Sequence, residues 1–92
     1  MNFEWDEAKN AINIGKHDVD FRDAVKVFED EYRLEREDSR IDYGETRTQV
    51  LGYTSFGVLF VVYTEREEDT IRIISARAAT RAEKKMYNDR SF

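Results

Sequence analysis

The spacing of apolar side chains predicts two helices near the N-terminus. In WDEAKNAINIGKH, residues 5–17, apolar positions recur at near-helical spacing, Asp6 stands where an N-cap belongs and Gly15 where a C-cap belongs. In DFRDAVKVFED, residues 20–30, Asp20 is the candidate N-cap of a second helix. The apolar stripe of this second helix follows i, i+3, i+4, i+7 spacing and consists of Phe21, Ala24, Val25 and Phe28. The short link between the helices predicts that both pack on one face of a sheet.

Strand patterns and turn residues replace the helical spacing from residue 31 onward. A capping box, Thr80 with Glu83, then announces a last helix over residues 81–89. The predicted strands are YRLERE at an edge (32–37), TRTQVLGYT (46–54), VLFVVYTE (58–65) and TIRIISAR (70–77), with NFEW (2–5) as a further short edge strand. We predict one α+β domain over residues 1–92, with two N-terminal helices, a four-stranded mainly antiparallel sheet and a C-terminal helix.

Composition narrows the function classes. The 92 residues include no cysteine and one histidine, so we expect neither a disulfide framework nor a metal site, and no cofactor. No apolar run is long enough to span a membrane, and the N-terminus lacks a signal-peptide pattern, so we predict a cytoplasmic protein. The formal net charge is −5, which argues against a broad nucleic-acid surface.

The charge is unevenly distributed along the chain. Residues 71–92 carry a net charge of +4, whereas residues 1–70 carry −9. Arg77 and Arg81 flank the start of the last helix, where backbone N–H groups favour an anion, and this predicts a phosphate site. The alternative is that these arginines form surface ion pairs, for which the chain offers twenty carboxylates. Strand alternation would place Arg77 on the same face as Ile71 and Ile73.

His17 is the side chain whose unperturbed pKa lies nearest neutrality, which suits a general acid or base. Alternatively, Lys16 and His17 simply stabilise the negative end of the first helix. Tyr87 can hydrogen-bond a base or a phosphate, or it can be a packing residue with a solvated hydroxyl. The residues themselves leave these alternatives open.

Several motifs in this order resemble the BrnT family of toxins, the toxin halves of bacterial BrnT–BrnA toxin–antitoxin modules. They are W-D-x-x-K and K-H-x-V-x-F in the first part of the chain, T-E-R at residues 64–66, and R-I-I-S-A-R-x-A-T-x-x-E-x-x-x-Y at residues 72–87. The resemblance covers both ends of the chain and the central hairpin. Their combination carries the resemblance, since each motif alone is common.

The resemblance implies a RelE-like fold and a ribonuclease that inhibits translation by cutting RNA. It also implies neutralisation by a BrnA-like antitoxin with a DNA-binding portion, repression of the operon by the complex through its operator DNA, and toxin dimers within that complex. Carried onto this chain, the family pattern matches the following positions: Lys16, His17, Glu65, Arg66, Arg77, Glu83 and Tyr87.

Metal-independent RNA cleavage needs a base for the attacking 2′-OH, positive charge on the phosphate and a proton for the leaving oxygen. We predict these roles for five catalytic residues, with Lys16 and Arg81 binding the substrate phosphate. The five are His17, Glu65, Arg66, Arg77 and Tyr87. Two alternatives remain: a non-catalytic binding module that assembles with a DNA-binding partner to repress its operon, and a plain α+β domain whose arginines all form surface ion pairs.

Overall fold

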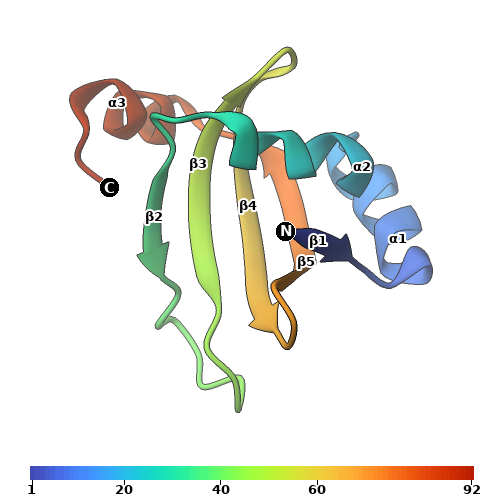
Figure 1. Cartoon of the computed structure of the whole chain (residues 1–92). Helices are drawn as coiled ribbons and strands as arrows, with labels where there is room; N and C mark the ends of the chain where they lie inside the picture. The colour runs from blue at the N-terminus through green and yellow to red at the C-terminus, as the bar shows by residue number, and fades with distance from the viewer.

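The computed structural model describes the whole chain, residues 1–92, as a five-stranded mixed sheet with three α-helices and one 3₁₀ helix (Figure 1). The strand order is β1-β5-β4-β3-β2, and every neighbouring pair is antiparallel except β1 with β5. The elements are β1 (Asn2–Glu4), α1 (Glu7–His17), α2 (Phe21–Ala24), η1 (Val25–Glu29), β2 (Leu34–Glu37), β3 (Thr48–Thr54), β4 (Gly57–Arg66), β5 (Thr70–Ala78) and α3 (Arg81–Asp89).

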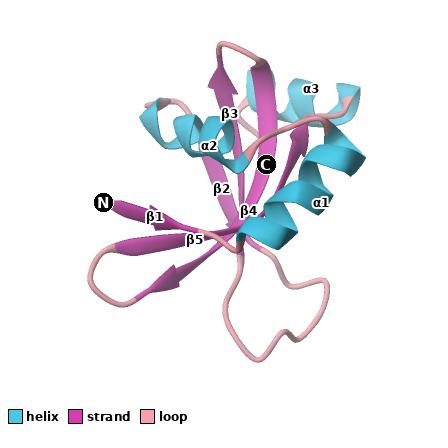
Figure 2. Cartoon of the chain, turned by 90° about the vertical axis from the view of Figure 1, so that its right-hand side faces the viewer, coloured by secondary structure: helices cyan, strands magenta, loops and turns pink.

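The α+β class is confirmed, but the predicted number of sheet strands is wrong. The short strand at the N-terminus joins the sheet as a fifth member, and it runs parallel to β5. It pairs only with residues 70–72, so the rest of β5 would be an open edge. Helix α1 lies along that edge, beyond β5, whereas α2 and η1 cover one face of the sheet and α3 the other (Figure 2). The two N-terminal helices therefore do not share one face.

The helix caps follow the sequence closely, with one exception. The carboxylate of Asp6 accepts the Lys9 N–H at 3.1 Å at the start of α1. The predicted C-cap at Gly15 is wrong, because the helix continues to His17. Asp18 closes it instead, in a left-handed conformation (φ 57°), and donates its backbone N–H to Ile14.

The second predicted helix is one α-helical turn that tightens into the 3₁₀ helix η1. Tightening changes which side chains face the sheet: Val27 is fully buried, whereas Val25 and Phe28 of the predicted stripe are only partly buried. Val27 lies directly over Gly52 of β3. A Cβ atom on Gly52 would come within 2.6 Å of the Val27 Cβ and 3.0 Å of its backbone.

We therefore expect Gly52→Ala to destabilise the fold by about 2 kcal/mol, because the added methyl group must push η1 away from the sheet. Urea unfolding followed by circular dichroism measures this loss. Gly15→Ala is the matched control, because nothing lies within 4 Å of the added atom and alanine favours a helix by up to about 1 kcal/mol. Equal stability of Gly52→Ala and the wild type would contradict the close approach.

A β-bulge determines where the arginine of β5 points. Val62 pairs with Ser75 and Tyr63 pairs with Ile73, so Ile74 is an extra residue in β5. The bulge shifts the alternation, and Arg77 comes to lie opposite Phe60 on the α3 face. The sequence prediction that Arg77 shares a face with Ile71 and Ile73 is therefore wrong. Those two isoleucines belong to the core beneath α2 and η1.

Candidate functional site at the end of β5

At the junction of β5 and α3, where the sequence analysis predicts an anion site, an arginine pairs with a carboxylate of the same chain. The Arg77 guanidinium donates two hydrogen bonds to the Glu83 carboxylate, at 2.7 and 3.0 Å, and stacks on Phe60 with its central carbon 4.2 Å from the ring centroid. The Thr80 N–H donates to the same carboxylate at 2.9 Å, and the Thr80 hydroxyl accepts the Glu83 N–H at 3.1 Å. The predicted capping box is thus confirmed.

Glu83 is ionised in this arrangement. Burial alone would raise the pKa of its carboxyl, but the hydrogen bonds from Arg77 and Thr80 outweigh burial and lower the pKa below its usual value. A carboxylate therefore occupies the place at the helix N-terminus where the sequence analysis put a substrate phosphate. Arg77 thus forms an ion pair, the alternative given in the sequence analysis, and its planar guanidinium binds a carboxylate of the same chain.

Two helix ends near this junction carry exposed basic side chains. The side-chain amide of buried Asn13 donates to the Ala76 carbonyl at 2.8 Å and accepts the Ala76 N–H at 3.2 Å, which fixes α1 against the end of β5. Lys16 and His17 follow in the last turn of α1, and both are exposed. Arg81, in the first turn of α3, is also exposed. The end of β5 thus brings together four of the predicted site residues, counting Arg77.

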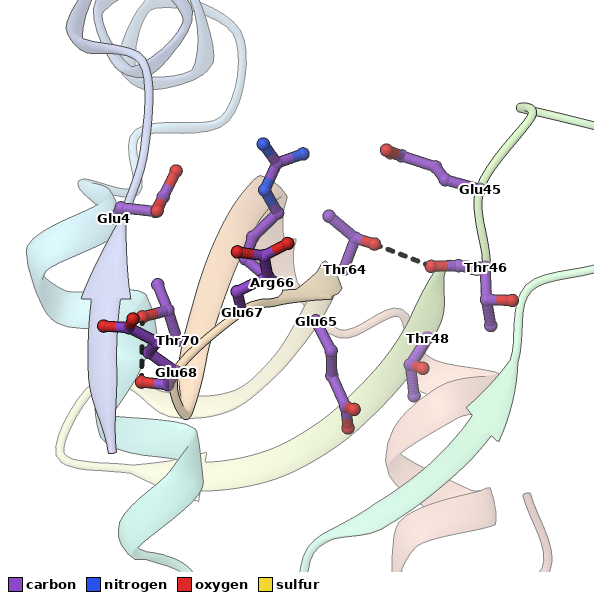
Figure 3. A pocket seen from close by; sticks show the side chains of 10 residues that line it. All are labelled: Glu4, Glu45, Thr46, Thr48, Thr64, Glu65, Arg66, Glu67, Glu68 and Thr70. Carbon is purple, nitrogen blue, oxygen red and sulfur yellow. Dashed lines mark hydrogen bonds between the residues drawn. The ribbon is translucent and has the colours of Figure 1, made fainter.

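Glu65 and Arg66 lie at the opposite end of the same strand pair. They pair with Ile71 and Thr70 beside the β4–β5 hairpin turn. Arg77 is six residues further along β5 than Ile71, which corresponds to about 20 Å. Glu65 and Arg66 point in opposite directions, as their alternation predicts (Figure 3). The predicted catalytic set therefore falls into separate groups.

The cavity around Arg66 is acidic. It has a volume of about 1050 Å³, and one guanidinium and four threonines share its lining with five carboxylates: Glu4, Glu45, Glu65, Glu67 and Glu68 (Figure 3). Such a lining repels a polyanion. The chain has no group of three or more His, Cys, Asp or Glu residues placed to hold a metal ion.

Tyr87 belongs to a third group. Its hydroxyl donates to the carboxylate of Asp30, which follows η1. Burial, followed by this hydrogen bond and the charge of Asp30, raises the pKa of Tyr87 to about 12. Asp30 also accepts the backbone N–H groups of Tyr32 and Tyr53, at 2.9 and 2.7 Å. Tyr87 thereby anchors α3 to the end of η1. This arrangement corresponds to the packing role that the sequence analysis gave as an alternative, except that the hydroxyl bonds a carboxylate rather than water.

The sequence analysis did not single out Asn13 or Asp30. The signal for Asn13 was its spacing: Asn10, Asn13 and His17 fall on one side of α1, and the first two are buried. Polar residues on the inner stripe of a helix indicate a hydrogen-bonding task. Asp30 stands between two other acidic residues, Glu29 and Glu31, and two of its three partners, Tyr53 and Tyr87, are distant in sequence.

The sequence model described as "Ribonuclease toxin, BrnT, of type II toxin-antitoxin system" matches residues 5–83. The chain belongs to this family. The resemblance drawn from the motifs is therefore confirmed, and family membership implies an antitoxin as partner. Tyr87 and Arg90 lie outside the matched region. No curated protein matches the chain at a significant level. No helix of this BrnT-family protein is long and apolar enough to cross a membrane.

Among solved structures, the ribonuclease toxin BrnT of Brucella abortus is similar, with a TM-score of 0.66 and 24% sequence identity. The match covers 88% of this chain and 99% of the Brucella chain. This likeness shows a common fold. The family match, rather than the structural likeness, connects the chain to ribonuclease toxins.

Proposed function

We propose that this protein is a metal-independent endoribonuclease toxin and that RNA binds where β5 runs into α3. One observation carries the proposal: exposed Lys16, His17 and Arg81 belong to helix ends beside this end of the sheet, whereas carboxylates line the cavity at the other end. A compact group of positive charge binds one phosphate even on an acidic protein.

In the proposed reaction the 2′-OH attacks the adjacent phosphorus, and the bond to the leaving 5′-oxygen breaks. A base takes the hydroxyl proton, an acid protonates the leaving oxygen, and the products are a 2′,3′-cyclic phosphate and a 5′-hydroxyl. His17 is the proposed acid or base. Arg81 and Lys16 stabilise the negative charge that develops on the phosphate.

Arg77 acts as a positioning residue in this proposal, because both arms of its guanidinium hold Glu83. It fixes the first turn of α3 and thereby the place of Arg81. Glu65 and Arg66 lie too far away to share the same phosphate.

We further propose the wider setting that the family suggests. The toxin inhibits translation in the cytoplasm and adopts a RelE-like arrangement. A BrnA-like antitoxin neutralises it, toxin pairs assemble in that complex, and operator DNA is bound only through the antitoxin. Support for this setting comes from membership in a type II toxin–antitoxin family.

We expect expression of the wild type to arrest bacterial growth and degrade RNA. His17→Ala and Arg81→Ala should each lower the rate of RNA cleavage about 10²-fold, because each removes a group that acts on the reacting phosphate. Growth curves, total RNA and cleavage of a synthetic RNA in EDTA measure these effects. Arg66→Ala is the matched control, since it removes an exposed arginine at the other end of the sheet and should retain activity.

Three other results of these assays would contradict the proposed site, mechanism or function. Loss of activity in Arg66→Ala but not in Arg81→Ala would move the site to the hairpin end. Dependence of cleavage on a divalent ion would overturn the metal-independent mechanism. A wild type that folds but neither cleaves RNA nor slows growth would favour the non-catalytic binding module.

A further inference from the structure

A second cavity, of about 390 Å³, lies between the η1–β2 connection and the β3–β4 turn, at the top of the sheet in Figure 1. Its size is in the range that holds a small ligand or a single large side chain. Two tyrosines, one lysine, three carboxylates and two hydroxyl-bearing residues line it: Lys26, Glu29, Asp30, Glu31, Tyr32, Tyr53, Thr54 and Ser55.

The tyrosines of this cavity are unusually open. Tyr53 is 62% exposed and Tyr32 is 67% exposed. The Arg90 guanidinium already lies over Tyr32, with its central carbon 6.0 Å from the ring centroid, but no cation of this chain lies over the Tyr53 ring. Glu29 and Glu31 are exposed and form no ion pair. An aromatic face and unpaired carboxylates are thus presented together.

Elsewhere in the molecule, arginine side chains bind an aromatic ring and a carboxylate at the same time. Four of its arginines lie against an aromatic ring while pairing with a carboxylate: Arg22 on Trp5 with Glu7, Arg33 on Phe28 with Glu35, Arg47 on Tyr43 with Glu45, and Arg77 on Phe60 with Glu83. A guanidinium suits both surfaces, because its plane stacks on the ring and its edge donates to carboxylate oxygens.

We propose that this cavity binds an arginine side chain of a partner protein, with Tyr53 under the guanidinium and Glu29 or Glu31 accepting its hydrogen bonds. Charge complementarity favours this occupant over a nucleic acid, since three carboxylates face one ammonium, that of Lys26. Lys26 is itself drawn aside, 3.8 Å from Asp23 and over the Phe56 ring. Arginine and tyrosine also dominate binding energy at protein interfaces.

The cavity is held in shape without the groups that would bind the arginine. Asp30 accepts the backbone N–H groups of Tyr32 and Tyr53, so it fixes both rims of the cavity to the end of η1. The Tyr53 ring and the Glu29 carboxylate take no part in those bonds. Replacing either one therefore alters recognition while the scaffold stays intact.

A titration tests the proposal. The probe is a short peptide with two arginines separated by glycines, added to the ¹⁵N-labelled full chain and followed by NMR. We expect saturable shifts at Tyr32, Tyr53 and Glu29, with at least fivefold weaker binding of the lysine peptide and none of the citrulline peptide, which keeps the shape but lacks the charge. Tyr53→Ala and Glu29→Gln should each weaken binding at least fivefold.

Ile12→Ala is the control, because Ile12 is a 58% exposed apolar residue of α1 and does not line the cavity. It should bind the peptide like the wild type. Equal binding of the lysine peptide, or shifts confined to the larger acidic cavity around Glu65 and Arg66, would show that charge alone attracts the probe and would overturn the proposal. Saturable shifts of the same residues with a short unstructured RNA, without a response to the arginine peptide, would assign the cavity to a nucleobase and also overturn it.

Discussion

Asn13→Leu is expected to destabilise the protein by roughly 4 kcal/mol, and so to lower the melting temperature by about 20 °C. The Asn13 side chain is nearly fully buried and bonds three backbone groups: the N–H and the carbonyl of Ala76 and, at 2.9 Å, the carbonyl of Val19. Leucine conserves the volume but leaves all three groups without a partner. Each such group costs about 1–3 kcal/mol when it stays buried.

The size of this effect reflects the position of Ala76. β1 covers β5 only up to residue 72, so the edge of β5 beyond that point has no neighbouring strand. The Asn13 amide donates and accepts there as a residue of an adjacent strand would. The same contact holds the last turn of α1, with Lys16 and His17, beside the proposed RNA site.

Urea unfolding followed by circular dichroism measures the loss, and Ile12→Ala is the control. Ile12 is the preceding residue of α1 and is 58% exposed, so its truncation should change stability by less than 0.5 kcal/mol. A loss below about 1 kcal/mol in Asn13→Leu would mean that water satisfies the edge of β5 once the amide is gone.

The sequence predicted those features that depend on residues close together in the chain. The N-caps Asp6 and Asp20 and the Thr80–Glu83 capping box are local patterns over two to three residues, and all three form as expected. The central strands were also found, since their apolar runs are long. The parallel pairing of β1 was missed, because three residues carry too little pattern to specify a partner far along the chain.

The candidate site shows the same division. The place of Arg77 and Arg81 at the β5–α3 junction followed from sequence order, but the partner of Arg77 and the approach of α1 did not. The bulge at Ile74 turned Arg77 toward Phe60 and Glu83, and no alternation pattern reveals one extra residue in a strand. Likewise, Glu65 and Arg77 belong to adjacent strands, yet the register places them at opposite ends of the pair.

Asp30→Ala is expected to cost about 3 kcal/mol and to loosen α3 from η1. The substitution removes the acceptor of two backbone N–H groups, those of Tyr32 and Tyr53, and of the Tyr87 hydroxyl. Urea unfolding gives the total loss, and near-ultraviolet circular dichroism reports the tyrosine environment. Tyr32→Phe is the control, because it keeps the backbone N–H and should behave like the wild type.

The hydrogen bond between Tyr87 and Asp30 also makes the stability of the fold depend on pH. Burial raises the pKa of Asp30, but its hydrogen bonds from Tyr53, Tyr87 and Tyr32 outweigh burial, so the net pKa lies below the usual value of 3.8. Because the folded-state pKa of Asp30 is lowered, the stability that its ionised carboxylate contributes is complete above about pH 4. This stability is lost as the pH falls through the folded-state pKa. For Tyr87 the pKa is raised to about 12, so its contribution is complete below about pH 10 and is lost as the pH rises toward 12.

Tyr87→Phe then decides between the two roles of this tyrosine. As an anchor, Tyr87 contributes one hydrogen bond, so its loss should cost about 1 kcal/mol, reduce the stability change between pH 10 and 12 and leave RNA cleavage within a fewfold of the wild type. As the proton donor of the sequence prediction, its loss should lower cleavage about 10²-fold at unchanged stability. The bond to Asp30 favours the anchor, because a hydroxyl with so high a pKa, already donating to a carboxylate, is a poor acid for a leaving oxygen.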